Sequence, residues 1–291
     1  MGKKLIALLV VLIVAVAGFY IHGHQTAPKS EYPEYLNFAG NYVFSVPKDY
    51  RVDEQAVPGL QLVYIGIQTS KTLEDLYKVD GLSLQQISDL SDHSGKAFKK
   101  YVNNSFLRDI KKNLSTDDVQ VKFGKTNGWD VARATVKKDG AQVRFVYLKN
   151  GRHPATIVSK NETDAFKKIE QTITDVENSD LKNEQSAIKQ SIQTTIQLAK
   201  DQKAPELYNG AASELRSKNT QEEVKGALTS ATPHLKDNIV ISGVTYSPGG
   251  FAAGLRFTSI SNRDAPPSFG VLVFKKADGQ WKLEQLSLPA G

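Results

Sequence analysis

The chain has 291 residues, no cysteine, 40% hydrophobic residues, 23% charged residues and a formal net charge of +6. This composition is typical of folded globular domains, and the lack of cysteine excludes disulfides, thiol nucleophiles and thiolate metal sites. The positive charge is spread along the chain, which argues against nucleic-acid binding.

An apolar segment lies at the N-terminus. Residues 5–21 contain no charged residue and follow Lys3 and Lys4. As a helix this segment would rise about 25 Å, which is at the short end of bilayer-spanning helices, and the lysines favour a cytoplasmic N-terminus. We therefore expect residues 1–24 to be a signal-anchor of a single-pass cell-membrane protein with extracytoplasmic domains. A signal peptide cleaved after Ala17, which would release a secreted protein, is the alternative.

The next segment is polar and leads into the first domain. Residues 25–37 contain Pro28 and Pro33, which indicates a stalk. We expect a first domain over residues 38–176. It should open with a strand at 42–46, where Tyr42, Phe44 and Val46 share one face, and continue with a buried strand at 60–65.

A long helix is predicted where apolar residues recur every four positions. The stripe consists of Phe98, Val102, Phe106, Ile110 and Leu114. A candidate anionic-binding surface lies on the opposite side, formed by the basic residues Lys96, Lys100, Arg108 and Lys111. A solvated helix face is the simpler interpretation of this row, and docking of an acidic partner is the alternative.

Strands return after this helix. Asp139-Gly140 and Asn150-Gly151 are hairpin turn signals, so we expect a meander of strands over 131–136, 141–148 and 155–159. Thr163 or Asp164 should cap a helix that closes the domain. This order of elements predicts an α+β domain with a mostly antiparallel sheet.

Residues 177–184 are polar and lack periodicity, so we expect a linker there and a second domain over 185–291. Three helices should come first, marked by the stripe Ile188, Ile192, Ile196 and Ala199, by Pro205 in a first turn, and by the capping-box pair Thr220 and Glu223. Four strands should follow, with turns at 247–250 and Asp278-Gly279. The helices are then expected to pack on one face of an antiparallel sheet.

Both halves resemble known families. The first resembles the PsbP-like domains at residues 42–50 (YVFSVPKDY) and 128–133 (GWDVAR) and in its closing helix. The second, over 184–288, resembles the SnoaL-like and nuclear-transport-factor-like (cystatin-like) cone domains in its three helices and at 277–283 (ADGQWKL). The resemblances imply an antiparallel sheet with helices, followed by three helices on a curved antiparallel sheet. They also imply an extracytoplasmic binding or assembly module, and a cone that in some relatives is an active site.

No motif for catalysis follows. Gly124-Lys125-Thr126 lacks the earlier glycine of a phosphate-binding loop, because that position is Val119, and no serine-hydrolase or zinc-protease motif occurs. His22 and His24 have no third ligand nearby in the sequence. We therefore expect no enzyme, no metal and no cofactor.

The sequence favours a membrane-anchored, extracytoplasmic, non-enzymatic binding or envelope-assembly protein of a bacterium, whose partner is another envelope protein or a small apolar ligand. A candidate ligand pocket in the second domain comprises Tyr208, Tyr246, Arg256, Phe257 and Trp281. One alternative is a weak or atypical enzyme that uses the cavity of this domain. Another is an adhesin that binds anionic cell-wall polymer through the basic helix face.

Overall fold

The computed structural model describes residues 33–38, 40–47, 50–57, 60–67, 83–87, 95–138, 141–150, 153–159, 163–262 and 265–290. The predicted signal-anchor and most of the predicted stalk lie outside these residues. Among the residues described, no helix has the length and apolar character needed to cross a bilayer. The fold is α+β with two antiparallel seven-stranded sheets, which confirms the predicted class.

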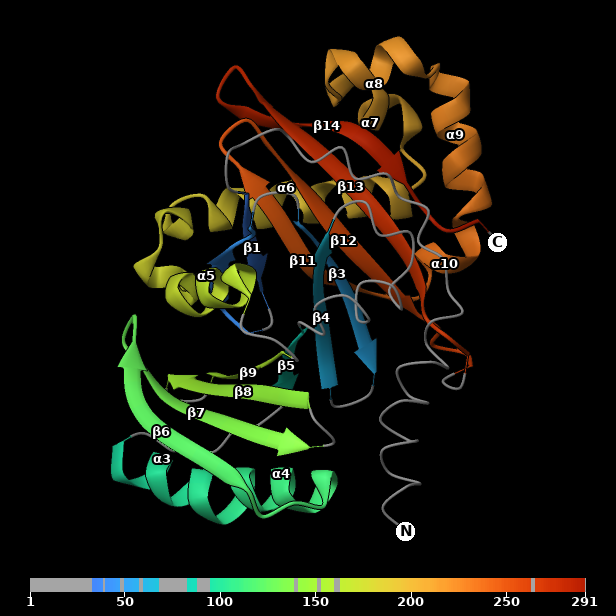
Figure 1. The fold of residues 1–291 in the computed structure, drawn as a ribbon. Helices are drawn as coiled ribbons and strands as arrows, with labels where there is room; N and C mark the ends of the chain where they lie inside the picture. Colours follow the sequence, from blue (N-terminus) through green and yellow to red (C-terminus); the bar gives the residue numbers. More distant parts are fainter. Residues whose placement is uncertain are drawn as a thin grey trace. The chain divides into compact units, whose positions relative to one another are not determined.

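The chain forms two compact units, one inserted into the other in sequence. Phe44–Thr174 make up the inserted unit. The host unit combines the described residues before Phe44 with those from Asp175 onward. Two consecutive domains joined near residues 177–184 were expected, whereas the described part of the chain passes between the units twice. In Figure 1, where the colours follow the sequence, the blue strand β1 from the early part of the chain lies beside the orange strands of the host sheet from its later part.

The host sheet has the strand order β10-β2-β1-β11-β12-β13-β14. Its strands are β1 (Glu34–Asn37), β2 (Tyr42–Ser45), β10 (Thr174–Asp175), β11 (Asn238–Ser247), β12 (Gly250–Thr258), β13 (Ser268–Ala277) and β14 (Gln280–Ser287). The last four match the four strands predicted for the second domain. The first three extend that sheet beyond the prediction.

Strand β1 lies within the segment that was expected to be a stalk. It pairs antiparallel with β11, and Leu36 is the register partner of Val244. Tyr35 and Leu36 are 2% and 0% exposed, and Leu36 belongs to the main core of the host unit. These residues therefore form part of a folded sheet instead of a spacer.

Hairpin turns in the host sheet follow from local sequence. Asp278 and Gly279 have φ values of 52° and 74°, the left-handed pair that a type I′ turn requires between β13 and β14. This confirms the hairpin predicted at Asp278-Gly279. Pro248 and Gly249 separate β11 from β12, as the turn signal there indicated.

Five helices of the host unit lie between η3 and β11 in sequence. They are α6 (Gln185–Lys200), α7 (Ala204–Gly210), α8 (Ser213–Lys218), α9 (Gln221–Ser230) and α10 (Thr232–Leu235). Before them come two short 3-10 turns, η2 (Val176–Asn178) and η3 (Asp180–Lys182). In α6 the predicted stripe is confirmed, with Ile188, Ile192 and Ala199 buried. The capping box of α9 is also confirmed, because the Thr220 hydroxyl accepts from the Glu223 N–H and the Glu223 carboxylate accepts from the Thr220 N–H.

The single helix predicted after Pro205 is wrong, because the structure has two helices there. Ala211 and Ala212 are extended and separate α7 from α8. The Ala212 N–H donates to the Leu283 carbonyl of β14 over 2.8 Å. A backbone group that is bonded to the sheet cannot also continue a helix, so this tertiary contact fixes the break.

The core of the host unit lies between the helices and one face of the sheet. Phe251, Leu255 and Phe257 of β12 are at most 1% exposed, and Leu272 and Phe274 of β13 lie beside them. Figure 1 shows α6 running across this sheet. Alternation along the strands sends every second side chain to this face.

The sheet of the inserted unit has the order β3-β4-β5-β9-β8-β7-β6. Its strands are β3 (Tyr50–Val57), β4 (Leu60–Ile67), β5 (Ser83–Ile87), β6 (Val119–Thr126), β7 (Trp129–Lys138), β8 (Ala141–Asn150) and β9 (His153–Ser159). Neighbouring β7, β8 and β9 confirm the predicted meander. Strands β3, β5 and β6 were not predicted.

The predicted long helix is present but contains a wider turn. It comprises α3 (Gly95–Tyr101), the π-helical segment η1 (Val102–Phe106) and α4 (Leu107–Leu114). A side chain four residues on is rotated by about 40° beyond a full turn of an α-helix, so a strict four-residue stripe drifts around the helix. The wider π turn partly cancels that drift. Phe98, Val102 and Ile110 are accordingly buried.

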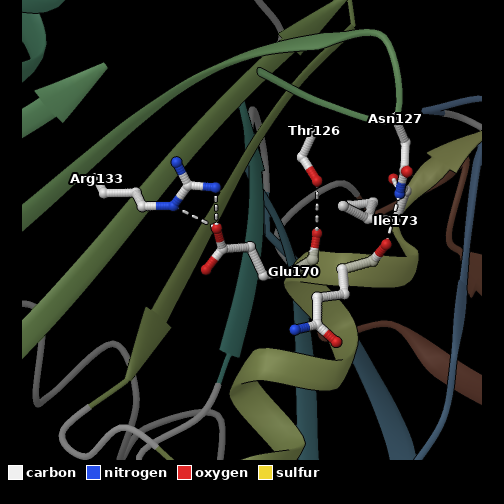
Figure 2. A network of polar contacts seen from close by, with 6 residues as sticks. Thr126, Asn127, Arg133, Glu170 and Ile173 are labelled. Atoms are coloured by element: carbon white, nitrogen blue, oxygen red, sulfur yellow. Dashed lines mark hydrogen bonds and ion pairs between the residues drawn. The ribbon is translucent and has the colours of Figure 1, made fainter. Parts of the chain in front are cut away.

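The turn between β6 and β7 clamps the closing helix α5 (Asp164–Thr172) through polar contacts (Figure 2). Asn127 Nδ2 donates to the carbonyls of Gln171 and Ile173 over 2.6 and 3.0 Å. The Arg133 guanidinium donates to the Glu170 carboxylate. Thr163 caps the other end of α5 by accepting from the Phe166 N–H, as one of the two predicted caps.

Candidate functional site

A groove of about 650 Å³ opens on the host unit. One wall is the stretch of α6 and its preceding turn from Asn183 to Leu198. The opposite wall comes from the β13–β14 hairpin over 274–283, and Leu207 and Gly210 of α7 close one side. All of these residues belong to the host unit, so one folded core positions the whole groove.

Small residues make room for the groove. Ala187, Ser191 and Thr194 are three or four positions apart on α6, so they share one side of the helix. Gly210 of α7 and Gly279 of the hairpin turn also line the groove. The hollow therefore results from short side chains on three elements.

The floor of the groove is apolar. Leu207, Phe274 and Leu283 are buried, and Trp281 is partly buried at one end. The indole ring of Trp281 packs edge-to-face against Phe251 and Tyr246, with ring centroids 5.0 and 6.1 Å away. These contacts anchor the tryptophan to the core and leave its remaining surface in the groove.

An ion pair lies beside Trp281. Lys276 Nζ is 2.7 Å from Glu184 Oε1 and 5.0 Å from the centre of the Trp281 ring. The hydrogen bond to Glu184 raises the pKa of Lys276, so its ammonium group stays charged at neutral pH. The two charges cancel, and Glu206 is the other charged residue among those that line the groove.

Acidic groups interact electrostatically with one another and with the ion pair. Burial, and then the nearby Asp180 carboxylate, raise the pKa of Glu34. Burial, followed by the charge of Glu184, raises the pKa of Tyr246. Both shifts favour the uncharged forms of these side chains.

Several polar side chains of the groove are free to bind a ligand. Within the described part of the chain, the side chains of Asn183, Gln190, Thr194 and Gln280 make no hydrogen bond or ion pair, and all four are exposed. Ser191 donates its hydroxyl hydrogen to the Ala187 carbonyl over 2.9 Å, which leaves its oxygen able to accept. The groove thus offers both donors and acceptors.

The five residues of the predicted pocket lie in different surroundings. Trp281 lines the groove and Tyr246 packs behind it. Phe257 is part of the buried core, 1% exposed. Tyr208 lies on α7, where its hydroxyl donates to the Arg216 carbonyl over 3.4 Å.

Arg256, the fifth predicted pocket residue, lies between Leu255 and Phe257, which face the helices. Alternation therefore turns Arg256 to the other face of the sheet.

A void between the helices and the sheet of the host unit is closely packed. This void is bounded by residues of α6, α10 and the strands, among them Ile196, Leu235, Leu255 and Phe257, and it is too small to admit a water molecule. Such a void leaves no space for a substrate. The residues that bound this void are mostly aliphatic and aromatic.

The basic helix face is partly neutralised. Lys96, Lys100 and Arg108 are exposed. Arg108 lies 3.6 Å from the Asp109 carboxylate, and Lys111 lies 3.7 Å from the Asp117 carboxylate. Half of the predicted row is thus engaged with acidic neighbours.

Sequence reasoning found Trp281 but missed most of the groove. Ala187, Gln190 and Thr194 carry no chemical motif, and their spacing on α6 indicates only a shared side of a helix. Lys276 and Glu184 are far apart in sequence, so their pairing depends on the tertiary fold. In the residues that the structure describes, no three His, Asp or Glu side chains form a candidate metal site.

The chain matches no protein-family model and no curated protein. A solved structure of a protein from Bacteroides thetaiotaomicron is similar over 87% of this chain and 89% of that chain, with 12% sequence identity and a TM-score of 0.35.

Proposed function

We propose that this protein is a non-enzymatic binding protein of the bacterial cell envelope, and that the groove of the host unit holds its ligand. The observation that carries this proposal is the open groove between α6, α7 and the β13–β14 hairpin. Ligand sites are typically concave and largely preformed, with an apolar floor and a few polar groups. The groove has this character.

The arrangement of charged groups favours binding over catalysis. Acid–base chemistry usually relies on a side chain that is positioned to exchange a proton with the substrate. Glu184 is instead held in an ion pair with Lys276, and the described lining contains no histidine. The closely packed void between the helices and the sheet likewise supports binding over an enzyme that works inside the cone.

Export and membrane attachment are part of the proposal. They are supported by the apolar segment 5–21 and the two lysines before it. The ligand would then be a component of the envelope outside the cytoplasmic membrane. The sequence alone favours another envelope protein or a small apolar ligand as the partner.

The test fills the groove without assuming a ligand. Ala187 is exposed and lies in the groove wall, so Ala187→Arg should obstruct the groove and leave the core intact. The purified full-length chain, in mild detergent, is passed over immobilised envelope extract, and its retention is measured. We expect Ala187→Arg to reduce retention at least tenfold.

The matched control is Gln193→Arg, which places the same side chain on α6 outside the groove. This variant should be retained like the original chain. Equal retention of both variants would show that the groove is not the binding site, and equal loss in both would assign the effect to added charge. Circular dichroism checks that both variants are folded.

A further inference from the structure

We infer that the ligand of the groove is an uncharged, hydroxyl-rich chain, that is, an oligosaccharide or a segment of neutral polysaccharide. This inference rests on the proposed binding function and names the class of ligand. Its evidence is the kind of polar group that lines the groove, the balance of charge, and the length of the wall along α6.

The polar groups match sugar hydroxyls. Asn183, Gln190 and Gln280 each present an amide, which supplies one acceptor oxygen and two donor hydrogens. Thr194 adds a hydroxyl that both donates and accepts. A sugar hydroxyl also donates and accepts, so these side chains can pair with neighbouring hydroxyls of one ring. A purely apolar ligand would bury the same amides without partners, which is unfavourable.

The charges of the groove do not select an ionic ligand. Lys276 is bound to Glu184 over 2.7 Å, so neither charge is free to hold a counter-charge on a ligand. Glu206 would repel an anionic polymer. A neutral ligand satisfies the groove without breaking the ion pair.

The shape favours a chain over a compact molecule. The wall follows α6 from Ala187 to Leu198, about 16 Å at the rise of an α-helix, and continues into the preceding residues Asn183 and Glu184. Of the apolar residues in the lining, Leu207, Phe274 and Leu283 are at most 5% exposed, whereas Leu198 and Trp281 are partly exposed. Sugar rings have apolar C–H faces and polar rims, so a ring can contact Trp281 and a neighbouring amide together.

The first experiment separates ligand classes on the envelope extract used for the proposed function. One portion is oxidised with periodate, which cleaves the vicinal diols of sugars, and another is digested with protease. We expect periodate to abolish retention of the full-length chain and protease to preserve it. Loss after protease with survival after periodate would overturn the glycan inference while leaving the groove as a protein-binding site.

The second experiment measures binding of defined probes by calorimetry. The probes are cellohexaose and mannohexaose, which are neutral and carry vicinal diols, and hexagalacturonate, which is anionic. We expect at least one neutral hexasaccharide to bind more tightly than its own disaccharide and than hexagalacturonate. No binding of any neutral probe, or a preference for the anionic one, contradicts the inference. Adding insoluble wall polysaccharide as competitor distinguishes a wall-bound source from a soluble glycan.

Variants of the groove wall test where the sugar binds. Gln190→Leu and Thr194→Val remove polar groups that are exposed and bonded to no described residue, so the fold should tolerate both. We expect each to weaken the hexasaccharide about 3- to 10-fold, the equivalent of one hydrogen bond. Gln193→Leu, on another side of α6, should bind like the original chain. If Gln190→Leu and Gln193→Leu behave alike, the sugar does not lie in this groove.

Discussion

Glu34 lies directly opposite Tyr246 in the antiparallel pairing of β1 with β11. Burial and the nearby Asp180 carboxylate raise the pKa of Glu34. The folded protein therefore binds the Glu34 proton more tightly than the unfolded chain does. The resulting stabilisation is fully present below the unfolded pKa and is lost as the pH rises through the folded pKa.

At neutral pH the charged Glu34 carboxylate thus destabilises the host sheet. We expect Glu34→Gln to raise the Tm at pH 7 by about 1–2 °C, a small shift because the group is half exposed. The gain should shrink as the pH falls below the ordinary range of a glutamate. Glu206→Gln makes the same change at an exposed position in the first turn of α7, where a carboxylate is weakly favourable, so this variant should not raise the Tm. A lower Tm for Glu34→Gln at pH 7 would contradict the assigned sign.

The pairing of β1 also predicts the effect of a core deletion. Leu36 is fully buried against the host core, so Leu36→Ala should lower the free energy of unfolding by about 2–5 kcal/mol. Urea unfolding measures this change, and hydrogen exchange should show faster exchange in β11. Substitution of a residue in a flexible stalk would not change the free energy of unfolding. An unchanged urea unfolding curve for Leu36→Ala would therefore indicate that β1 is not paired in solution.

Two glycines of the host unit should respond to alanine with opposite signs. A Cβ on Gly270 would lie 2.8 Å from the Ser287 carbonyl oxygen and 3.1 Å from the Phe257 ring, so backbone must move. We expect Gly270→Ala to destabilise the fold by about 1–3 kcal/mol. A Cβ on Gly226 in α9 would meet nothing within 4 Å, and Gly226→Ala should stabilise by up to about 1 kcal/mol. Thermal unfolding of the two variants compares them, and equal shifts would refute the packing argument.

The ion pair between Glu214 of α8 and Lys275 of β13 predicts an acid dependence. The hydrogen bond from Lys275 lowers the pKa of Glu214 to about 2. A lowered folded pKa stabilises the fold above the unfolded pKa, and this contribution is lost as the pH falls towards 2. Glu214→Gln should therefore have a slightly lower Tm than the original chain at pH 6, and the two should converge between about pH 4.5 and 2.

Lys275→Met provides the control for this pair. In the Lys275→Met background, Glu214→Gln should have little further effect, because the partner charge is already absent. Equal effects of Glu214→Gln with and without Lys275 would show that the carboxylate is stabilised by something other than the ammonium group.

Local signals in the sequence identified many elements of the fold. The Asp278-Gly279 turn, the Thr220 capping box and the buried stripe of α6 depend on neighbouring residues, and the structure confirms them. Strand β6 also had a local signal, because Val119 to Phe123 alternate between apolar and polar residues. We did not predict strand β6, although this alternation indicates a strand.

Other features depend on contacts between distant residues. Nothing local marks Ala212 as a helix break, because the Leu283 carbonyl that binds its N–H belongs to β14. Strand β1 is four residues long and pairs with a strand near the other end of the chain. The groove is equally non-local, since its hollow depends on which helix and hairpin face each other. A single sequence contains these residues but does not show their proximity.

The insertion of one unit within the other sets an order for folding as the chain emerges from its N-terminus onward. Every strand from β3 to β9 has emerged once Ser159 has done so, and the inserted unit can then complete its sheet early. Strand β1 emerges before all of these, yet its partner β11 begins only at Asn238. The host sheet must therefore wait for the last portion of the nascent chain, and β1 has to remain unpaired with β11 until then.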